Sequence, residues 1–140
     1  MTEEQRQYLT ACRDRYLGDF RNDIMPFWLK YGLDRKNGGV FTCLDRDGTL
    51  MDSTKSVWFQ GRFGFIAAYA YNNIEKNPEW LAASKSCIDF IENHCFDTDG
   101  HMFFTVTAEG RGKCTTISSR LSLRVFVAVI LTAHSIGWLV

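Results

Sequence analysis

The sequence predicts a mainly α-helical fold with short β-hairpins in its loops, and three observations support this prediction. Apolar residues recur at spacings of three and four over residues 9–24 and again after Pro78, as on one face of a helix. Asp and Gly gather in short turn sequences between the helical stretches. The chain has 140 residues and is 46% hydrophobic, which is enough for one domain with its own core.

The first helix is predicted to begin at Thr2, because Thr2 and Gln5 have the spacing of a capping box. One apolar stripe follows: Leu9, Cys12, Tyr16, Phe20 and Ile24. Pro26 should end or kink this helix because it has no N–H to donate, and Gly32 is a suitable terminus. Residues 37–39 break the pattern with Asn-Gly-Gly.

A β-hairpin is predicted next, with strands at 40–44 and 49–51 around a turn at Asp45–Gly48. Ser53 or Thr54 would cap a second helix that runs from about Lys55 to Asn73. A third helix should start at Asn77-Pro78, with Pro78 at the first helical position. Its apolar face is expected to be Trp80, Ala83, Cys87 and Ile91. A strand at 101–108 and a turn at 109–112 would follow the loop at 94–100.

The chain contains a weak internal echo with an offset of 52 residues. PFWL at 26–29 returns as PEWL at 78–81, and CLDRDG at 43–48 returns as CFDTDG at 95–100. Chance and a repeat of stacked helical hairpins both explain it. The two Asp-x-Asp-Gly segments lack the further ligands of an EF-hand and are interpreted as turns. His94 and His101 do not have the spacing of a zinc site, so no metal is expected.

Composition excludes several classes of partner. Sixteen basic and sixteen acidic residues cancel, so we expect no nucleic-acid partner. Five cysteines without a CxxC pair favour a reduced, cytoplasmic compartment, and the polar start of the chain argues against a signal peptide. The longest apolar run, 125–131, is too short to span a membrane.

Residues 55–63 differ from the rest of the chain. Lys55, Trp58, Gln60 and Arg62 place a cation, an indole, an amide and a guanidinium at the start of the second helix. Trp58 and Arg62 are four apart and should share a face. Arg and Gln would bind the hydroxyls of a sugar while Trp58 stacks on its apolar face. A buried Trp58 with Arg62 paired to a nearby Asp is the open alternative.

Three segments resemble the N-acylglucosamine 2-epimerase family: GGVFTCLDRDG at 38–48, TKSVWFQGR at 54–62 and GHMFFTVT at 100–107. The resemblance covers residues 14–112. It implies that residues 1–112 are the amino-terminal part of an (α/α)6 toroid, namely its first helical hairpins with β-hairpins in the loops. It also implies that full-length relatives interconvert N-acetylglucosamine and N-acetylmannosamine, or a related sugar pair, by removing the proton at C2.

The resemblance also implies roles for single residues. Arg62 would hold the developing enediolate as the catalytic residue of this segment, and Trp58 would pack against the sugar ring. Gln60 and Lys55 would bind or position the substrate. No cofactor is implied. The family's acid and base histidines lie in later helices, so we expect this polypeptide alone to be inactive, or to be a non-catalytic module that binds a sugar or a protein.

Residues 113–140 depart from the family pattern. Lys113 is followed by CTTISSR, without the Glu that the family carries in its next helix. All acidic residues lie before residue 110, so residues 1–112 carry a net charge of −3 and the remainder +3. We expect a divergent tail, produced by a shifted reading frame or a truncation. An incomplete toroid would expose apolar faces and self-associate through them.

Overall fold

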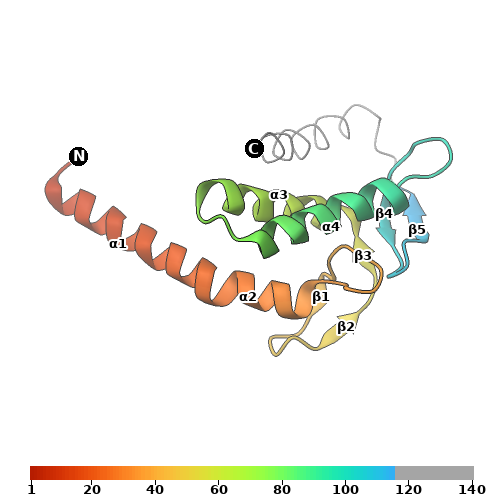
Figure 1. The fold of residues 1–140 in the computed structure, drawn as a ribbon, viewed down its shortest axis with the longest axis horizontal. Helices are drawn as coiled ribbons and strands as arrows, with labels where there is room; N and C mark the ends of the chain where they lie inside the picture. The colour runs from red at the N-terminus through yellow and green to blue at the C-terminus, as the bar shows by residue number, and fades with distance from the viewer. Residues whose placement is uncertain (116–140) are drawn as a thin grey trace.

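The structure is a computed structural model that describes residues 1–115. It consists of a long helical arm, a hairpin of two helices and two small sheets (Figure 1). In chain order the elements are α1 Glu3–Asp19, η1 Phe20–Ile24, α2 Met25–Phe27, η2 Trp28–Gly32, β1 Cys43–Leu44, β2 Leu50–Asp52, β3 Lys55–Ser56, α3 Val57–Asn73, α4 Pro78–His94, β4 Phe103–Val106 and β5 Gly112–Thr115. The predicted tail, beyond its first three residues, lies outside the described residues.

The helical arm begins as predicted. The Thr2 hydroxyl accepts a hydrogen bond from the Gln5 N–H at 3.2 Å, and the Gln5 side chain accepts one from the Thr2 N–H at 3.0 Å. No residue of α1 is buried, and α1 extends away from the rest of the molecule (Figure 1). Phe20, the fourth of the five residues in the predicted stripe, packs edge-on against Trp80 with 5.7 Å between ring centroids. The stripe is therefore covered only where the arm meets α4.

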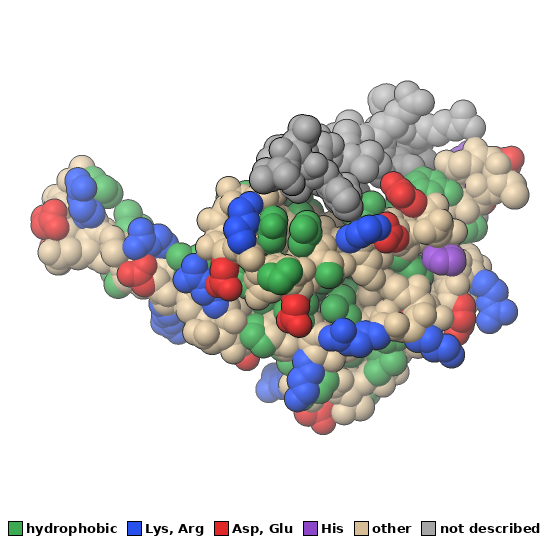
Figure 2. Space-filling model, in the orientation of Figure 1, with side chains coloured by type: hydrophobic (Ala, Val, Ile, Leu, Met, Phe, Trp, Pro, Cys, Tyr) green, Lys and Arg blue, Asp and Glu red, His purple; other side chains and the backbone are tan. Residues whose placement is uncertain are grey.

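Pro26 does not end the arm. The helix widens into π-helical turns, η1 before Pro26 and η2 after it, and ends at Gly32 as predicted. The Met25 N–H donates to the Phe20 carbonyl, five residues back, directly before the residue that has no N–H to donate. Charged side chains of both signs alternate along the exposed arm (Figure 2).

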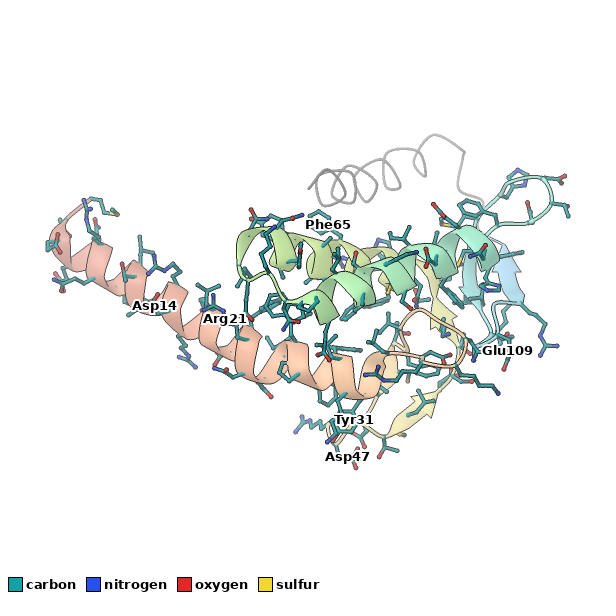
Figure 3. All side chains as sticks on the ribbon, viewed as in Figure 1. Asp14, Arg21, Tyr31, Asp47, Phe65 and Glu109 are labelled. Atoms are coloured by element: carbon teal, nitrogen blue, oxygen red, sulfur yellow. The ribbon has the colours of Figure 1, made fainter. Side chains whose placement is uncertain are left out.

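The first predicted hairpin forms, but its first strand is shorter than expected and its second strand lies one residue later. Val40 lies outside β1 and instead forms an isolated antiparallel bridge with Leu33. β1 and β2 pair antiparallel around the Asp45–Gly48 turn. The Tyr31 ring lies against Gly48, and Tyr31 and Asp47 are neighbours in Figure 3. The hairpin is therefore anchored on the end of the helical arm.

Three turns share one geometry. In each, the fourth residue is a Gly with φ between 77° and 90°, and its N–H donates to the carbonyl of the first residue at 3.0 Å. The turns are Asp45–Gly48, Asp97–Gly100 and Thr107–Gly110. The first two belong to the internal echo, so the matching sequences also have matching backbones. The third lies two residues before the predicted turn at 109–112.

Helices α3 and α4 form an antiparallel hairpin and contain most of the core. Asn77 caps α4 by accepting from the Glu79 N–H at 3.0 Å, and the predicted apolar face of α4 is buried. Gly64 of α3 allows close packing, since a Cβ there would lie 3.3 Å from the Cys87 Cβ. Among the described residues, no helix is long and apolar enough to cross a membrane.

The prediction that Ser53 or Thr54 caps the second helix is wrong, because α3 begins at Val57 with Ser56 as its N-cap residue. Lys55 and Ser56 are held instead as β3, which pairs with β4 in the three-stranded antiparallel sheet β3–β4–β5. This sheet packs on the helices through a cluster of five buried side chains: Val57, Phe90, Ile91, Cys95 and Val106. The start of α3 is thereby held by two contacts, the pairing of β3 with β4 and the burial of Val57 in this cluster.

Candidate functional site

Trp58 and Arg62 lie on the exposed face of α3, one helical turn apart. The Arg62 guanidinium carbon is 4.2 Å from the centroid of the Trp58 ring, a cation–π contact. Trp58 is 48% exposed. No carboxylate of residues 1–115 forms an ion pair with Arg62. The prediction of a shared face is confirmed, and the alternative of a buried Trp58 with an Asp-paired Arg62 is wrong.

Arg62 also lines a pocket of about 220 Å³. Helix α3 provides one set of lining residues, and Trp28 with the segment 40–42 provides the other: Phe59, Arg62, Phe63 and Ile66 against Trp28, Val40, Phe41 and Thr42. Arg62 and Thr42 are the polar side chains of this lining. The pocket therefore combines a mainly apolar lining with one guanidinium, an arrangement that suits a ligand with both an apolar face and polar groups.

Gln60 is fully buried and holds residues 40–42, which form the second wall of this pocket. Its Oε1 accepts from the Val40 N–H at 2.7 Å, and its Nε2 donates to the Val40 carbonyl at 2.6 Å. Val40 lies outside any strand, so the Gln60 amide takes the place of a strand partner for both backbone groups. The structure places Gln60 beneath the pocket surface.

Lys55 is also fully buried, with 0% exposure. Its Nζ donates to Asp34 Oδ2 at 2.7 Å, to the Gly38 carbonyl at 2.7 Å and to the Ala108 carbonyl at 2.9 Å. All three donors of the ammonium are thereby used within the protein. Lys55 lies with Gln60 in the layer behind the pocket, while Trp58 and Arg62 lie at the surface.

Asp34 is the residue that sequence analysis missed. It is 5% exposed, and besides Lys55 it accepts from the Lys36 and Asn37 N–H groups and from the Asn37 amide. Burial raises the pKa of this carboxyl, but the hydrogen bonds from Lys55 and Asn37 outweigh it and leave the pKa below its ordinary value. An Asp three residues before Asn-Gly is a turn signal that could have identified it.

The histidines of the described residues lie apart from Arg62. His94 ends α4 and lies against Phe90 with the two rings tilted, and His101 forms a pair with Asp97 at 3.3 Å in the turn before β4. Neither lines the Arg62 pocket. Within residues 1–115, no three His, Cys, Asp or Glu side chains are grouped so that they could hold a metal ion.

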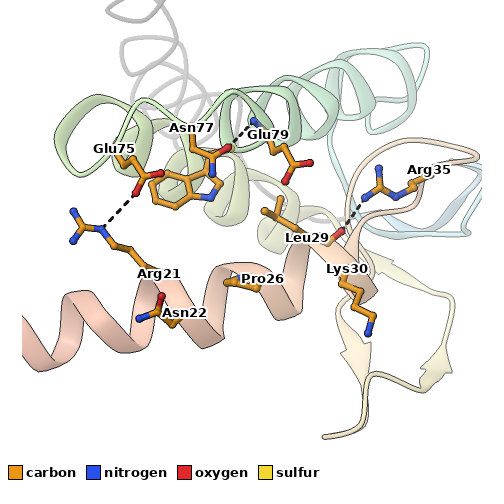
Figure 4. A pocket seen from close by; sticks show the side chains of 10 residues that line it. Arg21, Asn22, Pro26, Leu29, Lys30, Arg35, Glu75, Asn77 and Glu79 are labelled. Atoms are coloured by element: carbon orange, nitrogen blue, oxygen red, sulfur yellow. Dashed lines mark hydrogen bonds and ion pairs between the residues drawn. The ribbon is translucent and has the colours of Figure 1, made fainter.

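A larger hollow of about 560 Å³ lies between the helical arm and the start of α4 (Figure 4). Its charged groups largely satisfy one another or the backbone: Arg21 pairs with Glu75 at 3.7 Å and donates to the Ile74 carbonyl at 3.3 Å. Arg35 donates to the Leu29 carbonyl at 3.2 Å. The hollow contains none of the predicted site residues, and we base the candidate site on the smaller pocket.

Sequence comparison assigns the family. The family model of N-acylglucosamine 2-epimerase (GlcNAc 2-epimerase) matches residues 39–133. The chain belongs to the N-acylglucosamine 2-epimerase family. The N-acylglucosamine 2-epimerase of Bos taurus is 36% identical over 91 residues, which are 64% of this chain and 21% of that relative. This family member therefore spans about a fifth of the length of the relatives that it matches.

Solved structures confirm the fold expected of this family. A sugar epimerase from a ruminal bacterium matches with a TM-score of 0.61 and 27% identity over 71% of this chain and 26% of that structure. The cellobiose 2-epimerase of Spirochaeta thermophila matches with a TM-score of 0.72 and 22% identity, over 81% of this chain and 28% of that structure. The helical arm and the α3–α4 hairpin are therefore part of an (α/α)6 toroid architecture.

Proposed function

We propose that Trp58 and Arg62 form part of the sugar site of a 2-epimerase. In this function N-acetylglucosamine and N-acetylmannosamine, or a related sugar pair, are interconverted by removal and return of the proton at C2. The observation that carries the proposal is a guanidinium without a carboxylate partner in the described residues, stacked on a half-exposed indole beside an apolar pocket. Family membership supports the same function.

The chemistry explains why a guanidinium is useful here. In the open-chain sugar, the aldehyde at C1 acidifies the C2 proton, and removal of that proton places negative charge on the O1 oxygen of an enediolate. Arg62 would donate hydrogen bonds to this oxygen, and its positive charge would stabilise the negative charge that develops there. Trp58 would stack on the sugar and keep it beside the guanidinium.

Epimerisation also needs groups that move a proton on both faces of C2. His94 and His101 do not line the pocket, and His134 lies outside the described residues. We therefore propose that the 140-residue chain alone binds the sugar without turning it over. Gln60 and Lys55 would position the pocket rather than touch the sugar, since both are fully buried.

Titration calorimetry with N-acetylglucosamine and N-acetylmannosamine tests the site. Binding by the 140-residue chain should weaken by about tenfold to a hundredfold in Arg62→Ala, because a charge-assisted hydrogen bond is lost. Arg111→Ala is the matched control, since Arg111 is exposed and lies outside the pocket. Binding that Arg62→Ala leaves unchanged would overturn the site. NMR in deuterated water should show no exchange at C2, and exchange would overturn the proposal of an inactive chain.

Exposed apolar side chains favour a second candidate, a non-catalytic module that binds a protein or a second copy of itself. Leu9 and Tyr16 on α1 are 55% and 68% exposed, and Ile66 and Tyr69 on α3 are 44% and 54% exposed. Sedimentation velocity over a hundredfold concentration range tests self-association. A monomer at every concentration would contradict self-association.

We also propose a cytoplasmic location, supported by the odd number of cysteines.

A further inference from the structure

We propose that Lys55 is a positioning residue that orients Phe41, and with it the second wall of the pocket beside Arg62. This inference rests on the proposed sugar site for its functional consequence. The claim that Lys55 orients Phe41 depends only on the contacts of Lys55. Lys55 does not line the pocket and is fully buried, so it acts through another side chain.

The ammonium of Lys55 joins three segments that are far apart in the sequence. Asp34 follows the helical arm, Gly38 belongs to the Asn-Gly-Gly loop and Ala108 lies in the turn between β4 and β5. Lys55 itself is on β3, two residues before α3. A buried charge that makes three short hydrogen bonds has little freedom to move, so the positions of these segments are set relative to the start of α3.

Phe41 connects this cluster to the pocket. The Lys55 Nζ lies 5.1 Å from the centroid of the Phe41 ring and 4.2 Å from that of Phe90. Phe41 also lines the pocket that Arg62 lines, and its N–H donates to the Gly32 carbonyl at 2.7 Å. One aromatic ring therefore contacts the buried cation and also forms part of the pocket wall.

A neutral side chain of similar length would not substitute for Lys55. Removal of the Lys55 ammonium would leave the Asp34 carboxylate buried without its cation, and the Gly38 and Ala108 carbonyls without their donor. Such a loss is strongly destabilising. A loss of binding in Lys55→Met alone would therefore not separate positioning from folding. The charge-balanced pair Asp34→Asn with Lys55→Met removes the isolated charge and leaves Phe41 without its cation.

The test compares wild type, Lys55→Met and the double variant in the 140-residue chain. Urea unfolding, calorimetry with N-acetylglucosamine and the ring resonances of Phe41 by NMR are measured on each. We expect Lys55→Met to have the lowest urea midpoint and the double variant to recover much of it. The double variant should still bind about threefold to tenfold more weakly than wild type, with displaced Phe41 resonances, because the cation–π contact is missing.

Each outcome decides the matter. A double variant that binds like wild type and keeps the wild-type Phe41 resonances would overturn the proposal and leave Lys55 with a purely structural role. If wild type binds none of the sugar, the proposed function fails, and the Phe41 resonances then decide the role of Lys55 alone. Displaced resonances in a folded double variant support positioning, and unchanged resonances overturn it. Phe41→Leu, which keeps Lys55 and Asp34, should reproduce the binding loss without the change in urea midpoint.

Discussion

The side-chain amide of Gln60 pairs with both backbone groups of Val40, at 2.7 Å to its N–H and 2.6 Å to its carbonyl. The two residues are twenty positions apart, and both are buried. The contact attaches the loop that follows Asn-Gly-Gly to the first turn of α3. The Gln60 amide therefore sets the distance between the second wall of the pocket and α3, the helix that carries Arg62.

Gln60→Leu should destabilise the chain by about 2–3 kcal/mol, because two buried backbone groups lose their hydrogen bonds. Urea unfolding followed by far-ultraviolet circular dichroism measures the change. Gln60→Glu is the informative companion, since the carboxylate keeps an acceptor for the Val40 N–H but has no donor for the Val40 carbonyl. A Gln60→Leu midpoint equal to that of wild type would show that the amide contributes nothing to holding the loop.

Gly39→Ala should be among the most destabilising small substitutions in the chain. Gly39 has φ +72°, and a Cβ there would lie 2.5 Å from Gln60 Oε1 and 3.0 Å from the Phe90 ring. Strain and overpacking together should cost about 2–4 kcal/mol. Gly18→Ala is the matched control, because a Cβ at Gly18 meets nothing within 4 Å and Ala is favoured in a helix by roughly 1 kcal/mol. Equal urea midpoints for the two variants would contradict this account.

Local sequence signals predicted the elements well. The capping box at Thr2, the Asn77 cap and the apolar face of α4 depend on neighbouring residues, and all are found. The shared face of Trp58 and Arg62 follows from helical spacing alone. These features were predictable because each is decided within a few positions along the chain.

The remainder depends on contacts between distant segments. Pairing of β3 with β4, some fifty residues later, moved the start of α3 away from the predicted caps. The burial of Lys55 and Gln60 follows from Asp34 and Val40, twenty-one and twenty residues earlier. Lys55 and Arg62 are both charged and both lie within four positions of Trp58, so the sequence alone gives no reason to bury one of them. Only the fold shows that Lys55 is buried and Arg62 exposed.

Acid should weaken the structure through Asp34. Its folded-state pKa lies below the ordinary value of 3.8, so an unfolded chain binds the proton more readily. The stability contributed by this carboxylate is complete above that ordinary value and is lost as the pH falls below it. Urea midpoints measured from pH 6 to pH 2.5 should therefore decline at the acid end.

The Asp34→Asn, Lys55→Met double variant isolates this contribution. Other carboxyls also have lowered pKa values, among them the exposed Asp47 and Asp52 and the partly buried Asp97, and they titrate in both proteins. The difference between the two pH profiles therefore reports the Asp34–Lys55 pair. A double variant whose midpoint declines as steeply as that of wild type would remove Asp34 from the explanation.

Cys87 and Cys95 should resist thiol reagents in the folded chain. Burial raises the pKa of each thiol to about 12, so almost none is thiolate at pH 8. Cys43 is exposed and should react before either of them. Labelling with N-ethylmaleimide followed by peptide mass mapping measures each site separately. Labelling of Cys87 as fast as Cys43 without denaturant would show that the α3–α4 core opens readily.

Trp58→Ala should change Arg62 without unfolding the chain. Trp58 is half-exposed, so its loss costs little buried area, but the guanidinium loses the ring that lies 4.2 Å away. A cation–π contact at such a site contributes about 0.5–1 kcal/mol, so we expect a small change in urea midpoint and a clear shift of the Arg62 Nε–H resonance. Trp58→Phe keeps an aromatic face and should move that resonance less. If Trp58→Ala leaves the resonance in place, the guanidinium is held by other contacts, and Trp58 retains only its proposed stacking on the sugar.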